Sequence, residues 1–472
     1  MHIGRSKDIT RRAMFERLGK LAILGAGAPI AMNLASFSEA AAFTGDGYKA
    51  LVCVYLNGGN DHANTLVPAD AANYNLYSAL RGGGAGQTRG GLAFGLSELA
   101  ATALTPLNGQ TLSNNIRYAL TPGMTGMAAL FRLGKLGIQL NAGPLETPLT
   151  LDQYTNGNRT AYPLPPHLFS HIDQQAFWQT EVDRAHTGWG GRLGDLALSG
   201  NGNTMLTAIS ATGNAVFLSG ANTLQYQISP GGAVPIQGVK WRIMDSAPLT
   251  TAFRSLINQG STNTFEDEYA KVTRRSISLT DTVSSAMAGV SLTTAFNSSN
   301  TLAAQMKVVA QLIAARNALG MKRQVFFVSL PGFDTHDNLM GVHPGLMATL
   351  DEAMTAFYTA TVEMGVASQV TTFTTSDFGR TLSSNGGGSD HGWGGHHFIM
   401  GGAVKGGQYY GTAPSVSLTA NDQVGQGRLL PSTASDQMAA TLASWFGVSA
   451  GEMSTVLPNS GRFSPQDLGY MA

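Results

Sequence analysis

Residues 50–61 read ALVCVYLNGGND, an unbroken apolar run that passes directly into glycine and polar residues. A short run without polar alternation is typical of a strand that is buried on both faces, as in a parallel sheet. In open parallel sheets, ligands bind just beyond the carboxyl ends of the strands. The stretch therefore predicts an α/β fold and also indicates the edge of the sheet where a site would form.

Two more apolar runs repeat this pattern further along the chain. Residues 324–330 predict a second buried strand, and residues 370–375 predict a third. Apolar residues at helical spacing predict helices over 301–319 and 346–357. A strand, a helix and a second strand make a βαβ unit, whose strands are parallel and whose crossover is right-handed. We therefore expect one α/β domain with a mostly parallel sheet.

The composition narrows the class of protein. The 472 residues include 29 Lys and Arg against 29 Asp and Glu, a net charge of zero, and 43% are hydrophobic. A disordered chain would be more charged and poorer in apolar residues. A nucleic-acid-binding protein would carry a basic excess to neutralise phosphates. We expect a globular protein without a nucleic-acid partner, and the 58 glycines indicate many turns and loops.

The N-terminal segment has the features of an export signal. Residues 10–15 read TRRAMF, a twin-arginine pattern, and residues 21–38 are weakly apolar and uncharged. Three alanines at 40–42 offer small residues to a signal peptidase. An uncleaved membrane anchor is the alternative, which the low apolarity disfavours. Residues 1–42 thus predict a twin-arginine export signal, contact with the twin-arginine translocation machinery, and a periplasmic or secreted protein.

The remaining residues 43–472 predict a single α/β domain. Residues 143–299 are richer in Gly, Asn, Ser and Thr than the flanking sequence. Such a composition is typical of loops and turns. We therefore expect insertions at about 143–299, which would form a cap over the site and would set the choice of substrate.

Acidic and histidine side chains follow each of the three predicted strands and gather again in the glycine-rich residues 389–397. The candidate metal ligands are Asp61 after the first strand, Asp334 and His336 after the second, Asp377 after the third, and His391 and His396 in the glycine-rich stretch. Carboxylates and imidazoles without thiolates are a ligand set for Zn²⁺, Mn²⁺, Fe or Ca²⁺. Ligands from separate strand ends suit one or two divalent ions of a hydrolytic site.

Some of these residues also have structural interpretations. Asp61 follows two glycines and an asparagine, where aspartate is common as a turn or cap residue. Asp377 could be the N-cap of the segment that follows it. Their common position at strand ends favours the metal-binding interpretation.

Ser170 and Arg380 are the candidate catalytic residues. Ser170 precedes a predicted helix over 172–180, where the helix dipole and free N–H groups favour an anionic adduct. An ordinary N-cap serine is the alternative. The planar guanidinium of Arg380 fits a phosphate or sulfate oxygen, with a structural ion pair as its alternative. Neither a G-x-S-x-G elbow nor a P-loop occurs in the sequence, so neither a serine-hydrolase triad nor P-loop nucleotide hydrolysis is supported.

Taken together, the motifs resemble a bacterial family that is catalogued as domain of unknown function 1501. They are the twin-arginine start, LNGGND at 56–61, GWGGR at 188–192, GFDTH at 332–336, DFGRT at 377–381, DHGWG at 390–394, GRLLP at 427–431, DQ at 436–437 and WFGV at 445–448. The resemblance spans nearly the whole chain. It implies the three-layer α/β/α sandwich of the alkaline phosphatase and sulfatase superfamily, with metal at the strand ends.

The resemblance also implies roles for individual residues. Asp61 would resemble the early-strand metal aspartate, and Ser170 would resemble the nucleophile. One metal would be held by Asp334, His336 and a later histidine, either His391 or His396. Asp377 would resemble the aspartate of a second metal, but Phe378 follows it where the phosphatases of the superfamily have histidine. The spacing of the Asp/His pair is also shorter than in the phosphatases, so the number of metals, one or two, is left open.

The sequence therefore predicts an exported metal-dependent hydrolase that acts on a phosphate or sulfate ester, either small or polymeric. The nucleophile would be Ser170 or a water molecule, activated by one or two divalent ions. The alternative is an exported, non-catalytic binding or assembly protein that keeps the fold and a metal. The identity of the metal and the oligomeric state are left open.

Overall fold

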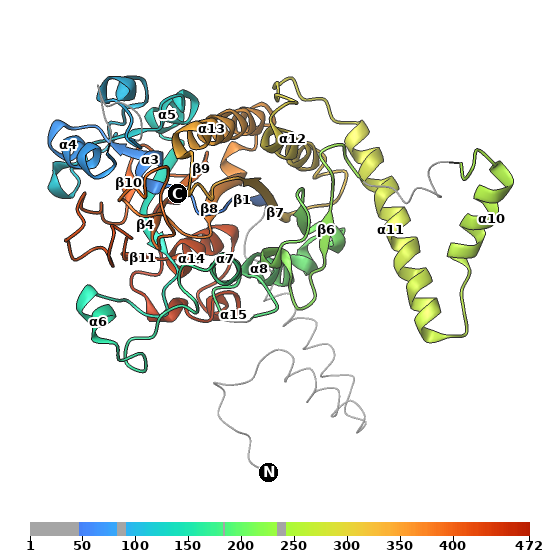
Figure 1. The fold of residues 1–472 in the computed structure, drawn as a ribbon. Coiled ribbons are helices and arrows are strands. Elements are labelled where there is room, and N and C mark those ends of the chain that lie inside the picture. The colour runs from blue at the N-terminus through green and yellow to red at the C-terminus, as the bar shows by residue number, and fades with distance from the viewer. Residues whose placement is uncertain (1–46, 83–90, 183–184, 234–241) are drawn as a thin grey trace, which may run out of the picture. The chain divides into compact units, whose positions relative to one another are not determined.

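A nine-stranded sheet forms the centre of the structure, a computed structural model that describes residues 47–82, 91–182, 185–233 and 242–472. The strands are β1 (Lys49–Asn57), β4 (Leu136–Gly143), β5 (Ala208–Ser210), β6 (Gln225–Gln227), β7 (Arg323–Pro331), β8 (Val370–Ser376), β9 (Gly395–Gly401), β10 (Tyr409–Tyr410) and β11 (Thr433–Ala434). Their order is β10-β4-β9-β8-β1-β7-β5-β6, and β11 pairs with β4 (Figure 1). Strand β9 is antiparallel to both of its neighbours, and the other pairings are parallel. The predicted export signal lies outside the described residues.

The three strands predicted from apolar runs lie side by side at the centre of this sheet. Strand β1 pairs with β7 on one side and with β8 on the other, and Leu56 lies opposite both Leu330 and Ser376. Residues 50–56 are all buried, as expected for a strand with helices on both faces. Because the three strands are parallel and in register, their carboxyl ends meet at one edge of the sheet.

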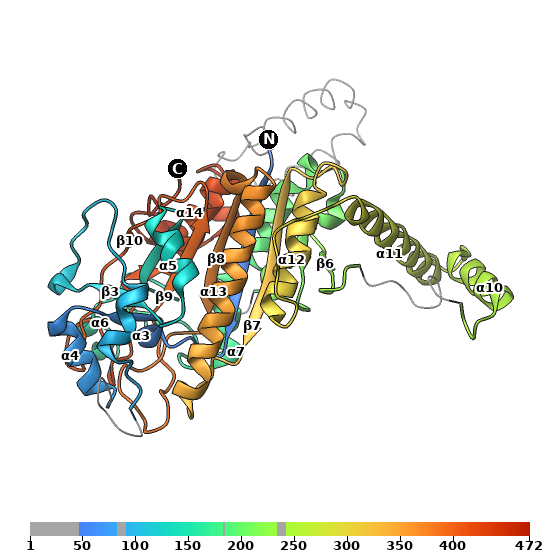
Figure 2. The same ribbon diagram turned by 90° about the horizontal axis from the view of Figure 1, so that it is seen from above.

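Helices cover both faces of the sheet. The α-helices of the described residues are α3 (His62–Thr65), α4 (Ala71–Leu80), α5 (Thr125–Arg132), α6 (Leu151–Asn156), α7 (His171–Thr180), α8 (Trp189–Ala197), α10 (Ala247–Asn258), α11 (Thr264–Ala288), α12 (Thr301–Ala314), α13 (Leu339–Glu363), α14 (Ser435–Phe446) and α15 (Met453–Val456). Helices α5, α12 and α13 lie on one face, and α7, α8 and α14 lie on the other (Figures 1 and 2). The predicted three-layer sandwich with a mostly parallel sheet is confirmed.

Smaller elements join these layers. Strands β2 (Leu66–Pro68) and β3 (Tyr118–Leu120) form a separate antiparallel pair. The short 3₁₀ helices are η1 (Leu96–Thr102), η2 (Ser113–Asn115), η3 (Leu198–Gly200), η4 (Thr204–Leu206), η5 (Val216–Leu218), η6 (Ala367–Gln369) and η7 (Ser460–Arg462). Among the described helices, none has the length and apolar character required to cross a membrane.

The main core lies between the sheet and helices α12 and α13. The predicted apolar stripe of α12, from Leu302 to Ile313, is fully buried. Asn300 caps this helix by accepting a hydrogen bond from Ala303 N at 2.9 Å. On α13, Leu350, Met354 and Phe357 are also fully buried. This core holds the central strands in place and so fixes the loops that leave their carboxyl ends.

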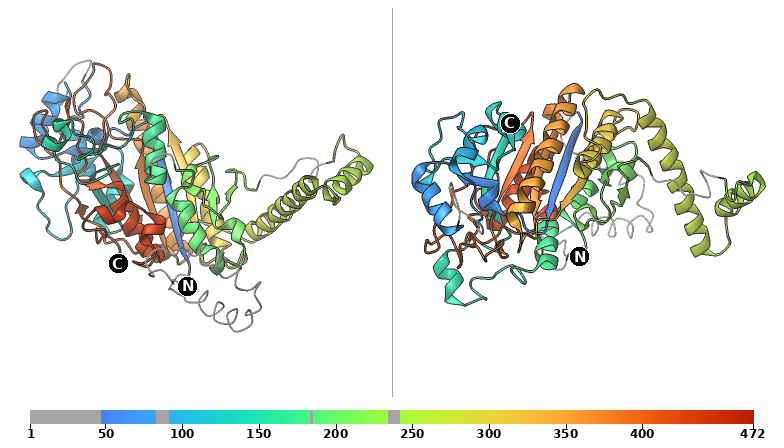
Figure 3. Two further views of the ribbon diagram at one scale, coloured as in Figure 1. Left: turned by 90° about the horizontal axis from the view of Figure 1, so that it is seen from below. Right: turned by 45° about the horizontal axis from the view of Figure 1, so that its top comes forward.

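Residues 143–299 contain two kinds of structure. Strands β5 and β6 extend the sheet, and α7 and α8 cover one of its faces, so these elements are part of the sandwich. Helices α10 and α11 form an arm that extends beyond the β6 edge (Figures 2 and 3). Leu279 and Val283 anchor the end of α11 in the main core.

Candidate functional site

The candidate site lies where the chain leaves β7, β1 and β8. Phe333 N donates a hydrogen bond to Asn57 O at 3.1 Å, which ties the turn after β7 to the end of β1. Gly58 permits this close approach: its φ is +117°, and a Cβ there would lie 2.5 Å from Asp334 N. The turn presents Asp334 at the sheet edge, and its side chain is 47% exposed.

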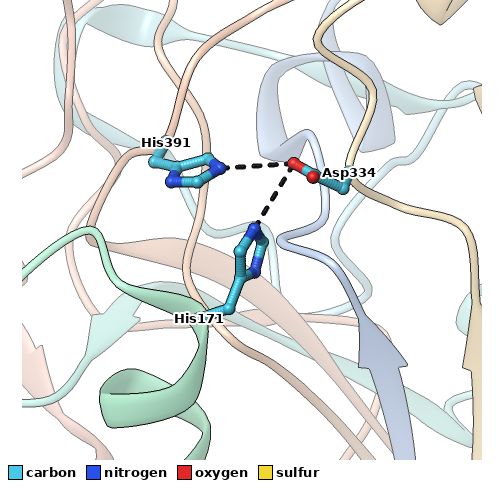
Figure 4. Close-up of side chains that lie close together, drawn as sticks. All are labelled: His171, Asp334 and His391. Carbon is cyan, nitrogen blue, oxygen red and sulfur yellow. Dashed lines mark hydrogen bonds and ion pairs between the residues drawn. The ribbon is translucent and has the colours of Figure 1, made fainter.

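Four side chains converge on one carboxylate oxygen, Asp334 Oδ1. The Nε2 atoms of His171, His336 and His391 lie 3.5, 3.1 and 3.2 Å from it, and Arg380 Nη1 lies 3.1 Å from it. His171 is the first residue of α7, whereas His336 follows β7 and His391 lies in the loop between β8 and β9. Figure 4 shows His171 and His391 pointing toward Asp334 from different parts of the chain.

Hydrogen bonds fix the tautomers of His171 and His391, the two less exposed histidines of this cluster. His171 Nδ1 lies 2.6 Å from Asp377 Oδ2, and His391 Nδ1 lies 2.7 Å from the backbone oxygen of Phe169. Both partners are acceptors, so each neutral ring carries its proton on Nδ1 and a lone pair on Nε2. The two Nε2 lone pairs therefore face the Asp334 carboxylate with no proton between them.

His336 extends this arrangement. Its Nδ1 lies 3.3 Å from Asp390 Oδ1, and its Nε2 lies 2.8 Å from His391 Nε2. The same reasoning gives His336 an Nε2 lone pair as well. Two nitrogen lone pairs at 2.8 Å repel each other unless a proton or a cation lies between them. A bound cation would remove this repulsion and would also accept the lone pair of His171 Nε2.

The cluster passes two further tests for a metal centre. The donor atoms of His171, Asp334 and His391 all lie within 4.8 Å of one another. Donors bound at about 2.0–2.1 Å around a tetrahedral ion lie about 3.3 Å apart, close to the observed spacings. In addition, His171 Nε2 is buried and has no hydrogen-bond partner among the described residues. A metal ion would supply the missing partner of His171 Nε2, so these residues fit a divalent cation.

The surroundings favour an ionised Asp334 carboxylate beside a neutral His391 imidazole. Partial burial acts to raise the pKa of Asp334, but the hydrogen bond and charge of Arg380 bring it below its ordinary value. Burial lowers the pKa of His391. The hydrogen bond to Asp377 raises the pKa of His171, and the same bond holds the ring in the metal-binding tautomer. A cation would compete with the proton for His171 Nε2.

Asp377 orients a ligand and does not itself face the cluster. It is fully buried, and its Oδ1 accepts hydrogen bonds from Tyr55 Oη at 2.8 Å and from Gly58 N at 3.2 Å. Its Oδ2 accepts from His171 Nδ1. The ring of Phe378 packs against those of His171 and His391 at centroid distances of 4.8 and 4.5 Å. Asp377 and Phe378 thus hold the imidazoles in position, which is a common arrangement around metal ligands.

Asp61 has a structural role in the geometry, in place of the predicted role as a ligand. It is fully buried and caps α3, because its Oδ1 accepts from Asn64 N at 3.0 Å. Its Oδ2 lies 2.6 Å from Arg81 Nη2 and 2.8 Å from Ser389 Oγ. Burial acts to raise the pKa of Asp61, but the charge of Arg81 keeps it below the ordinary value. Both oxygens are therefore occupied within the protein.

His396 also lies apart from the cluster. It is the second residue of β9, a strand buried along its whole length, and its Nδ1 accepts a hydrogen bond from Asn141 N at 3.1 Å. Its ring meets that of His62 edge-on, with a centroid distance of 5.4 Å. Burial holds the pKa of His396 well below the ordinary value. The strand thus directs His396 into the sandwich, whereas His391 stays in the loop.

Arg380 ties the strand-end loops together and is enclosed by protein. Its side chain is 0% exposed. Its Nη1 donates to Gly58 O at 3.0 Å as well as to Asp334, and its Nε and Nη2 both donate to Ser389 O. The structural interpretation of Arg380 therefore agrees with the geometry, and contact with a substrate does not.

Ser170 directly precedes His171 and is the N-cap residue of α7, although its side chain makes no capping hydrogen bond. Its hydroxyl donates to Asp173 Oδ2 at 2.5 Å.

Of the predicted ligands, the structure gathers Asp334, His336 and His391 and places Asp377 one step behind them. His171 was not predicted as a ligand. Its only signal in the sequence is its position beside Ser170 at the predicted start of a helix.

Comparisons with known proteins give a family and weak structural likenesses. A family model described as "Protein of unknown function (DUF1501)" matches residues 48–454. No curated protein matches the sequence. The crystal structure of Ps i-CgsB in complex with k-i-k-neocarrahexaose is similar with a TM-score of 0.35 and 9% identity, over 87% of this chain and 74% of that one. The lipoteichoic acid synthase LtaP from Listeria monocytogenes gives 0.33 and 8%, over 87% and 75%. The chain belongs to the DUF1501 family, as its motifs predict.

Proposed function

We propose that this DUF1501 protein binds a divalent metal ion through His171, Asp334 and His391, with His336 as a further donor, and hydrolyses a phosphate or sulfate ester. The observation that carries the proposal is the convergence of three imidazole Nε2 atoms on Asp334 Oδ1, while each Nδ1 atom faces an acceptor. Three imidazoles and one carboxylate suit Zn²⁺, Mn²⁺ or Fe. They suit Ca²⁺ poorly, because Ca²⁺ takes oxygen ligands.

The residues of this chain prepare the site for that ion. Asp377 and the Phe169 carbonyl hold the lone pairs of His171 and His391 toward the centre. Arg380 holds the Asp334 carboxylate and, through its buried hydrogen bonds, the loops on either side. A divalent ion held by these residues would polarise an ester oxygen and would lower the pKa of the attacking hydroxyl or water. Asp334 is 47% exposed and His391 is 23% exposed, so the centre is open to a substrate from solvent.

A non-catalytic metal-containing binding or assembly protein is the second proposal. The observation that favours it is the saturation of Arg380 by protein oxygens, which removes the arginine predicted to contact a substrate. The two proposals share the metal centre and differ in turnover. For either one, the twin-arginine pattern at residues 10–15 supports export to the periplasm or beyond.

The test is to purify the mature chain, measure its bound metal by mass spectrometry, and assay aryl phosphate, bis-aryl phosphate and aryl sulfate. The variants are Asp334→Ala and His391→Ala, and His186→Ala, an exposed histidine outside the cluster, is the matched control. We expect metal and turnover in the wild type and the control, and neither in the two cluster variants. Bound metal without turnover on any ester would support the binding protein. Equal metal content in all four proteins would refute both proposals.

A further inference from the structure

An anionic ester needs more positive charge at this site than the predicted Arg380 provides. The exposed rim carries negative charge, because Asp334 and Asp390 are 47% and 40% exposed. Arg380 is fully buried, and its donors are used by protein oxygens. A phosphate or sulfate group would therefore approach two carboxylates with the metal ion as its main attraction. A second cation at the rim would balance these charges.

Arg428 occupies such a position. Its Nε donates to the backbone oxygen of His391 at 2.8 Å, directly beside a proposed metal ligand. Its guanidinium carbon lies 5.2 Å from the ring centroid of Phe169, the residue whose carbonyl fixes the His391 tautomer. Neither Nη atom hydrogen-bonds to any residue in the described parts of the chain. The guanidinium is thus held at one nitrogen, its two terminal nitrogens make no hydrogen bond within the described residues, and its charge acts on the nearby Asp390 carboxylate.

The backbone around Arg428 is fixed. Val424 N donates to Arg428 O at 2.8 Å, and Arg428 N donates to Gly425 O at 3.0 Å, so the residue closes a tight turn. Gly427, in the same turn, has a φ of +71°, a conformation that favours glycine. The chain then pairs Leu429 with Gln423 in an isolated bridge. With its backbone fixed and its Nε bonded to His391 O, the Arg428 side chain loses little further entropy when it binds an anion.

We propose that Arg428 binds an oxygen of the tetrahedral oxyanion group, phosphate or sulfate, of the ligand at the metal centre. The inference depends on the metal ion of the proposed function, but it does not depend on turnover. Arginine suits the role because its planar donors match two oxygens of a phosphate or sulfate at once. The sequence motif GRLLP at 427–431, which no part of the metal centre explains, thereby acquires a role.

The experiment measures binding of inorganic phosphate and inorganic sulfate to the Zn²⁺- or Mn²⁺-loaded protein by isothermal titration calorimetry. The variants are Arg428→Gln and Arg428→Lys. The control is Arg132→Gln, an exposed arginine at the end of α5, next to the amino end of β4 and so away from the site. We expect the Kd of the preferred anion to rise about 10- to 100-fold in Arg428→Gln, the range for losing charge-assisted hydrogen bonds. The Kd of Arg428→Lys should lie between those of the wild type and Arg428→Gln, and the Kd of the control should match that of the wild type.

Metal content separates this role from a purely structural one. We expect Arg428→Gln to keep the metal stoichiometry and melting temperature of the wild type. Loss of the metal together with anion binding would show that Arg428 only supports His391 and would overturn the inference. An unchanged Kd, or a loaded wild type that binds neither anion, would overturn it as well. Anion binding that depends on Arg428 in a protein without turnover would leave the inference standing and refute the hydrolase.

Discussion

Replacement of Asp377 by asparagine should weaken metal binding through the tautomer of His171. In the native site, Asp377 Oδ1 accepts from Tyr55 Oη and Gly58 N, and Oδ2 accepts from His171 Nδ1 at 2.6 Å. Burial raises the pKa of Tyr55 well above its ordinary value, so Tyr55 keeps its proton and remains a donor. The oxygen of an asparagine at position 377 must therefore stay with Tyr55 and Gly58, and its NH₂ group must face His171.

That NH₂ group can only donate, so His171 Nδ1 has to become the acceptor and the ring proton has to move to Nε2. A protonated Nε2 cannot bind a metal ion. Loss of an outer hydrogen-bond partner costs about 10- to 100-fold in metal affinity. Because the variant also stabilises the wrong tautomer, we expect the upper end, about 100-fold or about 2.7 kcal/mol.

The assay is a zinc titration against a competing chelator of known affinity, with the wild type, Asp377→Asn and Asp351→Asn. Asp351 is the matched control, because it is also a buried aspartate that accepts backbone N–H bonds, from Gly126 and Met127. It lies on α13, outside the cluster. The control should keep the wild-type affinity. If Asp377→Asn binds zinc as tightly as the control does, the tautomer reasoning is refuted.

Three further predictions concern other parts of the chain. Burial raises the pKa of both Glu181 and Asp436, the latter to about 7. The native state therefore keeps protons that the unfolded chain releases above about pH 4. The stability of the folded state falls as the pH rises from about pH 4 through the pKa of Asp436 at about 7. In Asp436→Asn the melting temperature should fall less than in the wild type between about pH 5 and about pH 8; equal falls would contradict the prediction. Ser170→Ala should keep the metal and lose turnover if serine is the nucleophile, whereas full activity in ester assays would assign attack to water. Joint replacement of Arg11 and Arg12 by lysine should retain the protein in the cytoplasm in fractionation assays, and unchanged export would exclude the twin-arginine route.

The sequence was sufficient to predict the central strands and the sheet edge that carries the site. The apolar runs of β1, β7 and β8 have no polar alternation, which is a local signal for burial on both faces. Their parallel arrangement then places Asp334, which follows β7 directly, at the shared edge. This part of the site depends on strand positions alone, and strand positions follow from local patterns.

The rest of the site depends on long-range contacts that have no local pattern. Asp61 and Asp377 both follow central strands, but Asp61 meets Arg81, which nothing in the sequence connects to it. His391 and His396 differ because β9 begins at Gly395 and turns the later histidine into the sandwich. His171 reaches the cluster because α7 packs beside β8, a docking that its own sequence does not indicate.

The most direct measurement of the central claim is a crystal structure of the metal-loaded protein with anomalous diffraction data at the metal absorption edge. We expect an anomalous peak about 2.0–2.2 Å from His171 Nε2, His391 Nε2 and an oxygen of Asp334. A peak at Asp61 or at His396, or no peak among these three side chains in a crystal soaked with the metal, would contradict the account.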